Sequence, residues 1–397
     1  MIPRRKAHTC PGEFAEIARL CRSVDTYDET VVAEWERAMA AYVGVAHGAS
    51  VNSGRRGMTL ILEHLGVGVD DEVIVPAYTL KDLIPLIQEL GAHVVPADID
   101  PETLTISPDT IRARLSRRTK AILALHAFGA PCAIEEIVAL GNCSGVPVVE
   151  DCAHSLGATV RGRQTGSFGR AGFFSFETTK PINTFGGGMV VSDDTSLIEH
   201  IRKVTRSDAP DRQLLRKKVR ATRLERGMFA TGMAFPFLCF LATPGFKQTI
   251  ARIYRRVQHA PPNHVRYSPI QARLGLSKLA TLDRRIESRR RKAELLRGLL
   301  RPEVRPQRLL DGSASSWYFL VVVLPGTAAA VRNRLLARGI DAGIEDEIAD
   351  NCAALLGFRD CPNTERIYRR AIALPLYEDL PEEKVRRVAK TLNGLIS

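Results

Sequence analysis

The stretch FFSFETTKPINTFGGGMVV, residues 173–191, places one lysine, Lys180, between an aromatic run and three consecutive glycines. The residues before Lys180 alternate in the manner of a buried strand, and those after the glycines form a second apolar run. A lysine at such a junction either extends its amine to solvent or carries chemistry. The surrounding motifs must decide between these two interpretations.

Seven short apolar runs predict strands, and helical stretches separate them. The runs are residues 47–52, 71–76, 92–98, 120–126, 146–151, 172–176 and 187–192. This alternation is typical of an α/β protein with a mainly parallel, seven-stranded sheet covered by helices. Ligands of such sheets bind outside the carboxyl ends of the strands. Asp151, His154, Ser175 and Lys180 stand at or just after strand ends, so we expect the site there.

The pattern changes near Ser268. Residues 268–300 predict one long helix with an arginine-rich outer face, and a strand near 315–324 and two further helices follow. This predicts a smaller C-terminal α+β domain. The expected division is an N-terminal segment over residues 1–24, a large cofactor-binding domain over 25–262 and the small domain over 263–397.

Charge and cysteine content exclude several classes of protein. The chain has 397 residues and a net charge of +12, and residues 202–256 alone hold fourteen Lys or Arg against three acids. A nucleic-acid-binding protein would spread its basic residues differently, so we expect no nucleic-acid partner and no metal. The eight cysteines show no C-x-x-C pair, and the first residues lack an apolar secretory core. We expect a cytoplasmic protein with reduced thiols.

The residues near Lys180 match the needs of pyridoxal phosphate. A lysine amine forms a Schiff base when its surroundings favour the neutral form, and Asp151 could hold a pyridine nitrogen protonated. The turn VNSGRRG, residues 51–57, leads into a predicted helix and offers backbone amides for a phosphate. Hydroxyl groups of Ser53 and Ser175 could add donors. Reactive lysine, pyridine partner and phosphate-binding turn together predict this cofactor.

The chain resembles the DegT/DnrJ/EryC1/StrS family of fold-type-I, pyridoxal-phosphate-dependent aminotransferases. Motifs in the family order include DEVIVPAYTL, VPVVEDCAHSLGA, GSFGRAGFFSFETTK and ALPLYEDLPEEKV. The resemblance implies a cofactor Schiff base at Lys180, Asp151 on the pyridine nitrogen and His154 near the ring. It also implies phosphate binding by the turn at Ser53 and Gly54 and by Ser175. Family members are homodimers with shared sites.

Some positions depart from the family pattern. Arg55 replaces a threonine of the phosphate turn and could bind phosphate or pair elsewhere. Leu80 replaces an aromatic residue that stacks on the cofactor, and Tyr78 is the candidate substitute. Asn263, or the neighbouring His264, stands where a partner subunit supplies an asparagine. Purely structural roles for these residues also stay open. Asp151 could cap a helix, His154 could be a structural histidine, and Ser53 and Ser175 could be turn or strand residues.

An insertion over about residues 207–258 exceeds the usual family length. It begins with a basic helix over residues 212–226, continues with the charge-free run 227–246 and closes with an amphipathic stretch over 246–257. Pro236 and the Pro244–Gly245 pair interrupt the charge-free run, so an in-plane membrane contact fits better than a crossing. A lid over the substrate or a dimer contact is the alternative. Membrane contact would place the protein on the inner face of the membrane.

The sequence therefore predicts an aminotransferase of sugar biosynthesis. We expect the amino group to pass, with L-glutamate as donor, to a nucleotide-linked keto-deoxysugar. Two alternatives remain open. One is the same chemistry on a lipid-linked, apolar or cyclitol ketone at a membrane surface, and the other is a degenerate relative that binds the cofactor or a membrane without catalysis.

Overall fold

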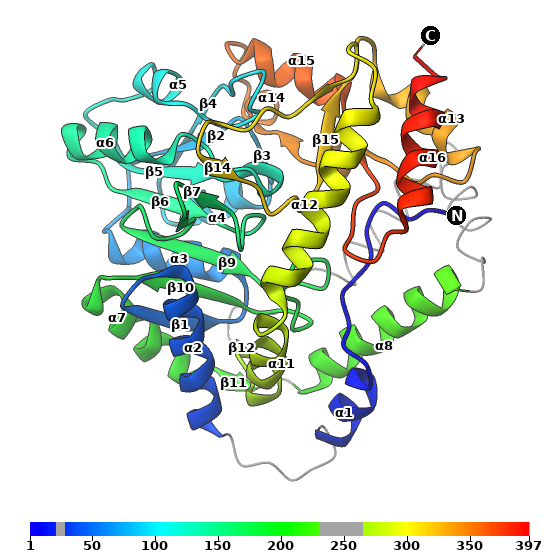
Figure 1. The fold of residues 1–397 in the computed structure, drawn as a ribbon. Coiled ribbons are helices and arrows are strands. Elements are labelled where there is room, and N and C mark those ends of the chain that lie inside the picture. The colour runs from blue at the N-terminus through cyan, green and yellow to red at the C-terminus, as the bar shows by residue number, and fades with distance from the viewer. Residues whose placement is uncertain (21–27, 211, 231–264, 397) are drawn as a thin grey trace.

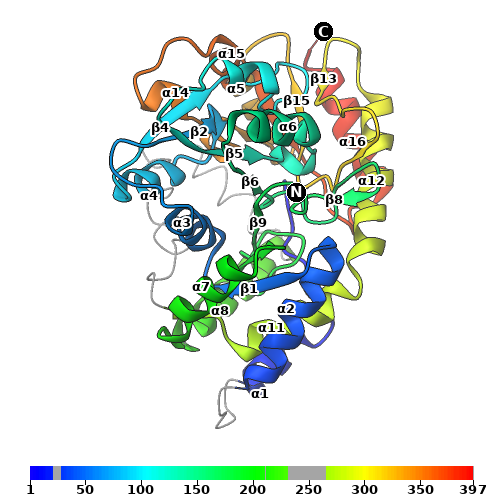
Figure 2. The ribbon, with the colours of Figure 1, turned by 90° about the vertical axis from the view of Figure 1, so that its left-hand side faces the viewer.

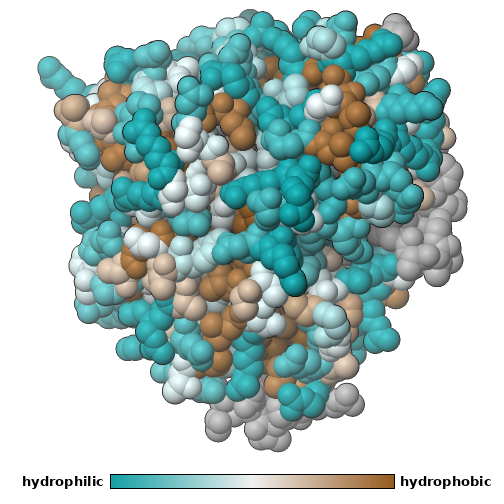
Figure 3. All heavy atoms as spheres, viewed as in Figure 1, coloured by the Kyte–Doolittle hydropathy of each residue, from teal (hydrophilic) through white to brown (hydrophobic). Residues whose placement is uncertain are grey.

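The computed structural model describes residues 1–20, 28–210, 212–230 and 265–396. A larger unit is built around a seven-stranded sheet, and a smaller unit with the C-terminus lies beside it (Figure 1). On the face shown in Figure 3, hydrophobic residues form small separate groups within a largely hydrophilic surface.

The central sheet confirms the seven predicted strands. They are β1 (His47–Val51), β2 (Glu72–Pro76), β4 (His93–Ala97), β5 (Thr119–Leu125), β6 (Val148–Asp151), β9 (Ala171–Ser175) and β10 (Gly188–Ser192). The order is β1-β10-β9-β6-β5-β2-β4, and β10 runs antiparallel to its two neighbours while the other adjacent pairs are parallel. The carboxyl ends of β1, β5, β6 and β9 consequently meet at one edge.

Helices pack on both faces of this sheet (Figure 2). One face is covered by α3 (Gly54–His64), α4 (Leu83–Glu89) and α7 (Thr195–Arg206), and the other by α2 (Glu29–Val43), α5 (Pro108–Arg112) and α6 (Ile134–Ser144). Successive strand residues serve opposite faces, as Phe173 packs with the first group and Phe174 with the second. Burial on both faces explains why the strands read as continuous apolar runs.

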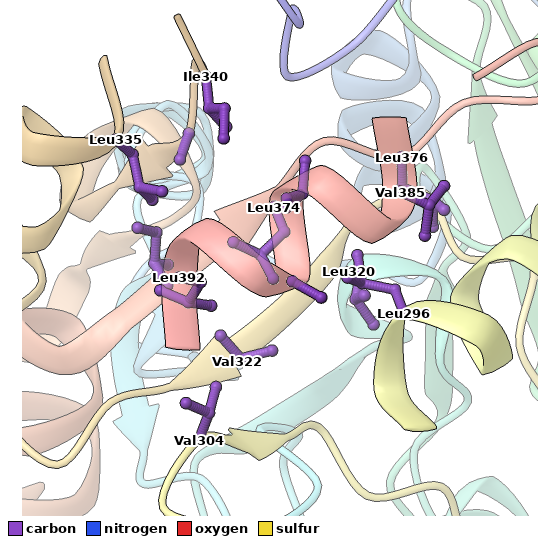
Figure 4. Close-up of a cluster of buried hydrophobic side chains, with 14 of the residues drawn as sticks. Leu296, Val304, Leu320, Val322, Leu335, Ile340, Leu374, Leu376, Val385 and Leu392 are labelled. Atoms are coloured by element: carbon purple, nitrogen blue, oxygen red, sulfur yellow. The ribbon is translucent and has the colours of Figure 1, made fainter. Parts of the chain in front are cut away.

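The smaller unit has an antiparallel sheet of order β13-β15-β18-β16. Its strands are β13 (Arg305–Pro306), β15 (Leu320–Val323), β16 (Gly343–Ile344) and β18 (Ala371–Leu374), and its helices are α13 (Ala328–Leu336), α14 (Cys352–Leu355), α15 (Pro362–Arg370) and α16 (Glu382–Asn393). Aliphatic side chains of the sheet, α12 (Leu282–Leu299) and α16 form its core (Figure 4). Ile2 joins this core, so the N-terminal segment starts against the C-terminal unit.

The prediction of a single long helix over residues 268–300 is wrong. The structure has two helices, α11 (Pro269–Leu279) and α12 (Leu282–Leu299). The chain turns at Thr281, whose hydroxyl donates to the carbonyl of Lys278 at 3.2 Å, and Arg285 donates to the same carbonyl at 2.9 Å. These side-chain donors replace the missing helical hydrogen bond, so the break is tolerated although the apolar spacing continues across it.

Short elements complete the described chain. They are α1 (Glu13–Leu20), β3 (Tyr78–Thr79), the 3₁₀ turns Ala127–Gly129 and Glu345–Glu347, β7 (Thr159–Val160), β8 (Arg163–Gln164), β11 (Ala209–Pro210), β12 (Val265–Arg266), β14 (Ser313–Ala314) and β17 (Asp350–Asn351).

The basic start of the insertion forms α8 (Arg212–Ala230), which packs against α1. Leu215, Lys218 and Thr222 are buried, a spacing that defines one helix face. The rest of the charge-free run and the amphipathic stretch that follows lie outside the described residues. Within the described part of the chain, no helix has both the length and the apolar character needed to cross a membrane.

Candidate active site

The predicted site residues gather at one edge of the central sheet. Asp151 is the last residue of β6 and Ser175 the last of β9, while Ser53 follows β1 by two residues. Since these three strands run parallel, their carboxyl ends meet there. Lys180 follows β9 in the connection to β10.

The glycine run lets the Lys180 connection pass close to its neighbours. A Cβ atom on Gly187 would lie 2.2 Å from the ring of Tyr267, and one on Gly188 would lie 2.7 Å from the backbone nitrogen of Gly54. Real Cβ atoms do not approach other atoms so closely. Gly187 also has a φ of 98°, which favours glycine. The run therefore packs the end of the Lys180 connection against the start of α3.

Cationic side chains from three helices hold the Lys180 connection in place. Lys218 of α8 donates to Glu177 at 2.7 Å, Lys278 of α11 to the carbonyl of Asn183 at 2.8 Å and Arg285 of α12 to the carbonyl of Pro181 at 2.6 Å. The backbone N–H of Lys180 donates to the carbonyl of Glu177 at 2.9 Å. The insertion helix thus reaches the segment that carries the candidate nucleophile.

Replacing Lys218 with Met should weaken this support. The change leaves the Glu177 carboxylate without its cation. We expect the visible band of the predicted cofactor to weaken and its half-reaction with an amino donor to slow about tenfold, because misplacement of a reacting group lowers its rate steeply. Lys217→Met, on the exposed face of the same helix, is the matched control. Lys218→Arg should restore much of the rate. Equal half-reaction rates for Lys218→Met and Lys217→Met would contradict the prediction.

Asp151 is buried at the end of β6, with 5% of its surface exposed. Its Oδ1 accepts a hydrogen bond from the backbone N–H of Ala153 at 2.9 Å. Burial raises the pKa of Asp151, while that N–H and the charges of Lys180 and His126 oppose the rise. A cation placed against this carboxylate would stabilise its ionised form.

A buried network fixes the end of β6 beneath Asp151. His126 donates its backbone N–H to the carbonyl of Asp151 at 3.2 Å, and its Nε2 lies 2.9 Å from Glu150 Oε2. The Glu150 carboxylate also accepts backbone hydrogen bonds from Gly166, Phe168 and Gly169. Cys152 lies close enough to complete a metal-ligand set with His126 and Glu150. Because the Glu150 oxygens already have these partners, the network is structural.

His154 lies within an aromatic stack. Its ring centroid is 4.4 Å from that of Tyr318 and 6.2 Å from that of Phe128, and both neighbours are nearly parallel to it. Burial lowers the pKa of His154 well below its usual value, and the charge of Lys180 lowers it further. Within the described residues, the buried Nδ1 atom has no hydrogen-bond partner. An unpaired buried nitrogen is costly and points to a ligand group.

The lowered pKa of His154 should make the apoprotein sensitive to acid. Below about pH 6.5 the unfolded chain binds a proton at this residue that the folded chain does not, so stability falls as pH falls, by at most about 1.4 kcal/mol per pH unit. His154→Gln should remove this part of the pH dependence. Urea unfolding at pH 7.5 and 5.5 measures it, with the exposed His93→Gln as control. An unchanged pH dependence in His154→Gln would contradict the assignment.

The candidate phosphate turn forms the start of α3. Ser53 is the N-cap, and its Oγ accepts a hydrogen bond from the backbone N–H of Arg56 at 3.1 Å. Gly54 is buried as the first helical residue, and Ser175 at the end of β9 pairs with Gly188. The partial positive charge of the helix N-terminus favours an anion here.

The three positions that depart from the family pattern, or could substitute there, are Arg55, Tyr78 and Leu80. Arg55 forms an ion pair with Asp82. Tyr78 is buried edge to face against Phe128, with ring centroids 5.9 Å apart, and within the described chain its hydroxyl has no partner. Leu80 is 47% exposed. The remaining candidates, Asn263 and the alternative His264, lie outside the described residues.

The comparisons with known proteins identify the family. Residues 13–393 match the model of the DegT/DnrJ/EryC1/StrS aminotransferase family. The chain belongs to this family. It is therefore an aminotransferase, and its family implies pyridoxal phosphate as the cofactor.

Solved structures of similar fold cover nearly the whole chain. Aminotransferase TlmJ from Streptoalloteichus hindustanus is 25% identical, with a TM-score of 0.80 and coverage of 99% of this chain and 98% of its own. DesV of S. venezuelae is 25% identical, with a TM-score of 0.77 and coverages of 98% and 95%. DesI, crystallised in the presence of its TDP-sugar product, is 24% identical, with a TM-score of 0.76 and coverages of 100% and 93%.

The residues present in this aminotransferase fit pyridoxal phosphate. Within the described residues the buried Nδ1 atom of His154 has no partner, and the helix N-terminus at Ser53 suits a phosphate. The buried carboxylate of Asp151 offers the negative charge that a protonated pyridine nitrogen requires. No carboxylate of the described residues lies within ion-pair distance of the Lys180 amine. The donor set matches an aldehyde, a pyridine nitrogen and a phosphate group.

Several residues of the site could not be found by sequence reasoning. Tyr318 and Phe128 contact predicted residues, Thr179 lies within hydrogen-bond distance of Tyr318, and Glu177 is bound by Lys218. Tyr318 belongs to the C-terminal unit and is distant in sequence from Lys180, so no local motif links the two residues. The burial of Lys218 could have been predicted, since Lys218 lies between Leu215 and Val219 on the apolar side of the predicted helix.

Proposed function

We propose that this aminotransferase transfers the amino group of L-glutamate to a nucleotide-linked keto sugar, with Lys180 as the residue that binds the cofactor. The observation that carries the proposal is the convergence of the Lys180 connection, the buried Asp151 carboxylate and the α3 N-terminus at one sheet edge. The aminotransferase family adds the reaction class.

Each residue has a defined task in this proposal. When bound, pyridoxal phosphate supplies a carbonyl for amines to attack and a pyridine ring that accepts electrons. Lys180 binds the cofactor and, once released, moves the proton at the α-carbon of the donor. Asp151 keeps a proton on the pyridine nitrogen through its negative charge. Ser53, Gly54 and Ser175 bind the phosphate, and His154 offers Nδ1 beside the ring.

The acceptor is the least constrained part of the proposal. DesI has a TDP-sugar product, which supports a nucleotide-linked sugar as the acceptor here. A competition experiment tests it: enzyme in the amine form is mixed with nucleotide-linked keto sugars, keto acids and cyclitol ketones. Return of the visible cofactor band with the keto sugars alone supports the proposal. Return only with the cyclitol ketones would contradict it.

A second proposal concerns contact with a membrane surface. The exposed side of α8 carries Arg216, Lys217, Arg220 and Arg223, together with Leu224, which is 70% exposed. Basic residues near an anionic lipid surface stabilise binding by about 1 kcal/mol each. Such contact would suit an acceptor embedded in a membrane. Flotation with liposomes of anionic and of neutral lipids tests it, and absence of the protein from the anionic liposome fraction would exclude the contact.

A further inference from the structure

Tyr318 contacts two of the candidate site residues, Lys180 and His154. The Lys180 amine lies 4.5 Å from its ring centroid, and its hydroxyl lies 3.0 Å from the hydroxyl oxygen of Thr179. Its ring stacks on His154 at 4.4 Å. Tyr318 is only 6% exposed. A residue of the C-terminal unit therefore contacts the two residues of the large unit that flank the proposed cofactor position.

An unusual backbone conformation next to Tyr318 positions its side chain beside Lys180 and His154. Trp317 has a φ of 50°, a conformation that bulky residues rarely adopt. The hydroxyl of Ser315 accepts the backbone N–H of Trp317 at 2.9 Å, and the hydroxyl of Ser316 donates to the carbonyl of His154 at 3.1 Å. A Cβ atom on Gly129 would lie 2.6 Å from the backbone nitrogen of Tyr318, so only glycine fits.

Strained backbone of this kind persists only where surrounding contacts enforce it, and it concentrates at functional sites. The contacts at Trp317 and Gly129 fix the backbone at Tyr318, and they also place the buried Trp317 ring in the core of the C-terminal unit.

The charges that face the Tyr318 hydroxyl favour its ionised form. Burial is the largest single influence and raises the pKa of Tyr318, but the charges of Lys180 and Arg5 together with the hydrogen bond between Tyr318 and Thr179 outweigh it. The net result is a pKa below the usual value of 10.0. His154, which stacks on the Tyr318 ring, stays uncharged because burial and the charge of Lys180 lower its pKa.

We propose that Tyr318 is a further catalytic residue, which exchanges a proton with the amine of Lys180. In this step an N–H bond of the Lys180 ammonium breaks and an O–H bond forms on the Tyr318 phenolate. The electron pair left on nitrogen makes the amine a nucleophile for a carbonyl carbon. The reverse transfer restores the starting pair, and no oxidant or reductant takes part. The proposal rests on the proposed role of Lys180.

The first test uses the apoprotein and needs no catalysis. Ultraviolet titration of tyrosinate should show one tyrosine in the wild type that ionises at lower pH than the others. That ionisation should disappear in Tyr318→Phe, and in Lys180→Met and Thr179→Val it should move to higher pH. Tyr368→Phe is the matched control, because burial raises the pKa of Tyr368 to about 12. Persistence of the early ionisation in Tyr318→Phe would overturn the proposal.

The second test measures reaction rates. Tyr318→Phe keeps the ring against Lys180 and His154 but removes the hydroxyl, so it should bind pyridoxal phosphate with nearly unchanged affinity. The glutamate half-reaction should slow by about 10²-fold, the range of one acid–base group. Wild-type rates in Tyr318→Phe would refute the role of Tyr318 alone. A wild-type protein that binds the cofactor without using Lys180 would instead refute the proposed function.

Discussion

Lys180→Met will bind pyridoxal phosphate without the visible band of a lysine-bound cofactor, and transamination will fall by about 10⁴-fold or more, because the variant lacks both the nucleophile and the proton carrier. Methionine has a similar length and fills the same space without an amine. The fold should survive, since the Lys180 connection is held by Lys218, Lys278 and Arg285 rather than by the Lys180 side chain.

Absorbance spectra and borohydride reduction followed by peptide mass analysis check this prediction. In the wild type, reduction should fix the cofactor mass to the peptide that contains Lys180. Lys217→Met, on the exposed side of α8, should behave as the wild type. A cofactor mass fixed to another lysine of the wild type would show that the site has been misassigned.

Asp151→Asn should lower the rate of the half-reaction by about 10²- to 10⁴-fold while leaving the fold intact. The amide can still accept the backbone N–H of Ala153, but it carries no charge to keep a proton on the pyridine nitrogen. Single-turnover kinetics with L-glutamate measures the loss. A cofactor analogue whose ring carries a permanent positive charge should restore part of the rate in the variant.

Stability separates this role from a structural one. Because burial raises the pKa of Asp151, the ionised carboxylate destabilises the folded apoprotein at neutral pH, and the neutral amide removes that cost. The apoprotein of Asp151→Asn should therefore unfold at the same or a higher urea concentration than the wild type at pH 7.5. A large loss of stability together with an unchanged half-reaction rate would contradict the assignment.

The strands and the edge at which the site lies were predictable because both depend on local sequence. Burial on two faces gives β5, β6 and β9 short apolar runs, and parallel strands bring Asp151 and Ser175 to the same edge whatever the details of packing. The sequential order of motifs then predicted the family, which the comparison confirms.

Other features of the fold and of the site depend on side-chain contacts, which the spacing of apolar residues in the sequence does not reveal. The helix break at Thr281 arises from side-chain hydrogen bonds to one carbonyl. The pairing of Arg55 with Asp82 and the approach of Tyr318 to Lys180 join residues that are distant in sequence. The roles proposed for Lys180, Asp151, Ser53 and Ser175 stay predictions until they are tested by substitution.

The visible absorbance of the purified protein, recorded with pyridoxal phosphate before and after addition of L-glutamate, tests most directly whether Lys180 binds the cofactor and glutamate donates the amino group. We expect a yellow band from cofactor bound at Lys180 that glutamate bleaches to the amine form. A band that glutamate leaves unchanged would contradict the proposed donor. The absence of any band in the presence of added cofactor would contradict the proposed active site itself.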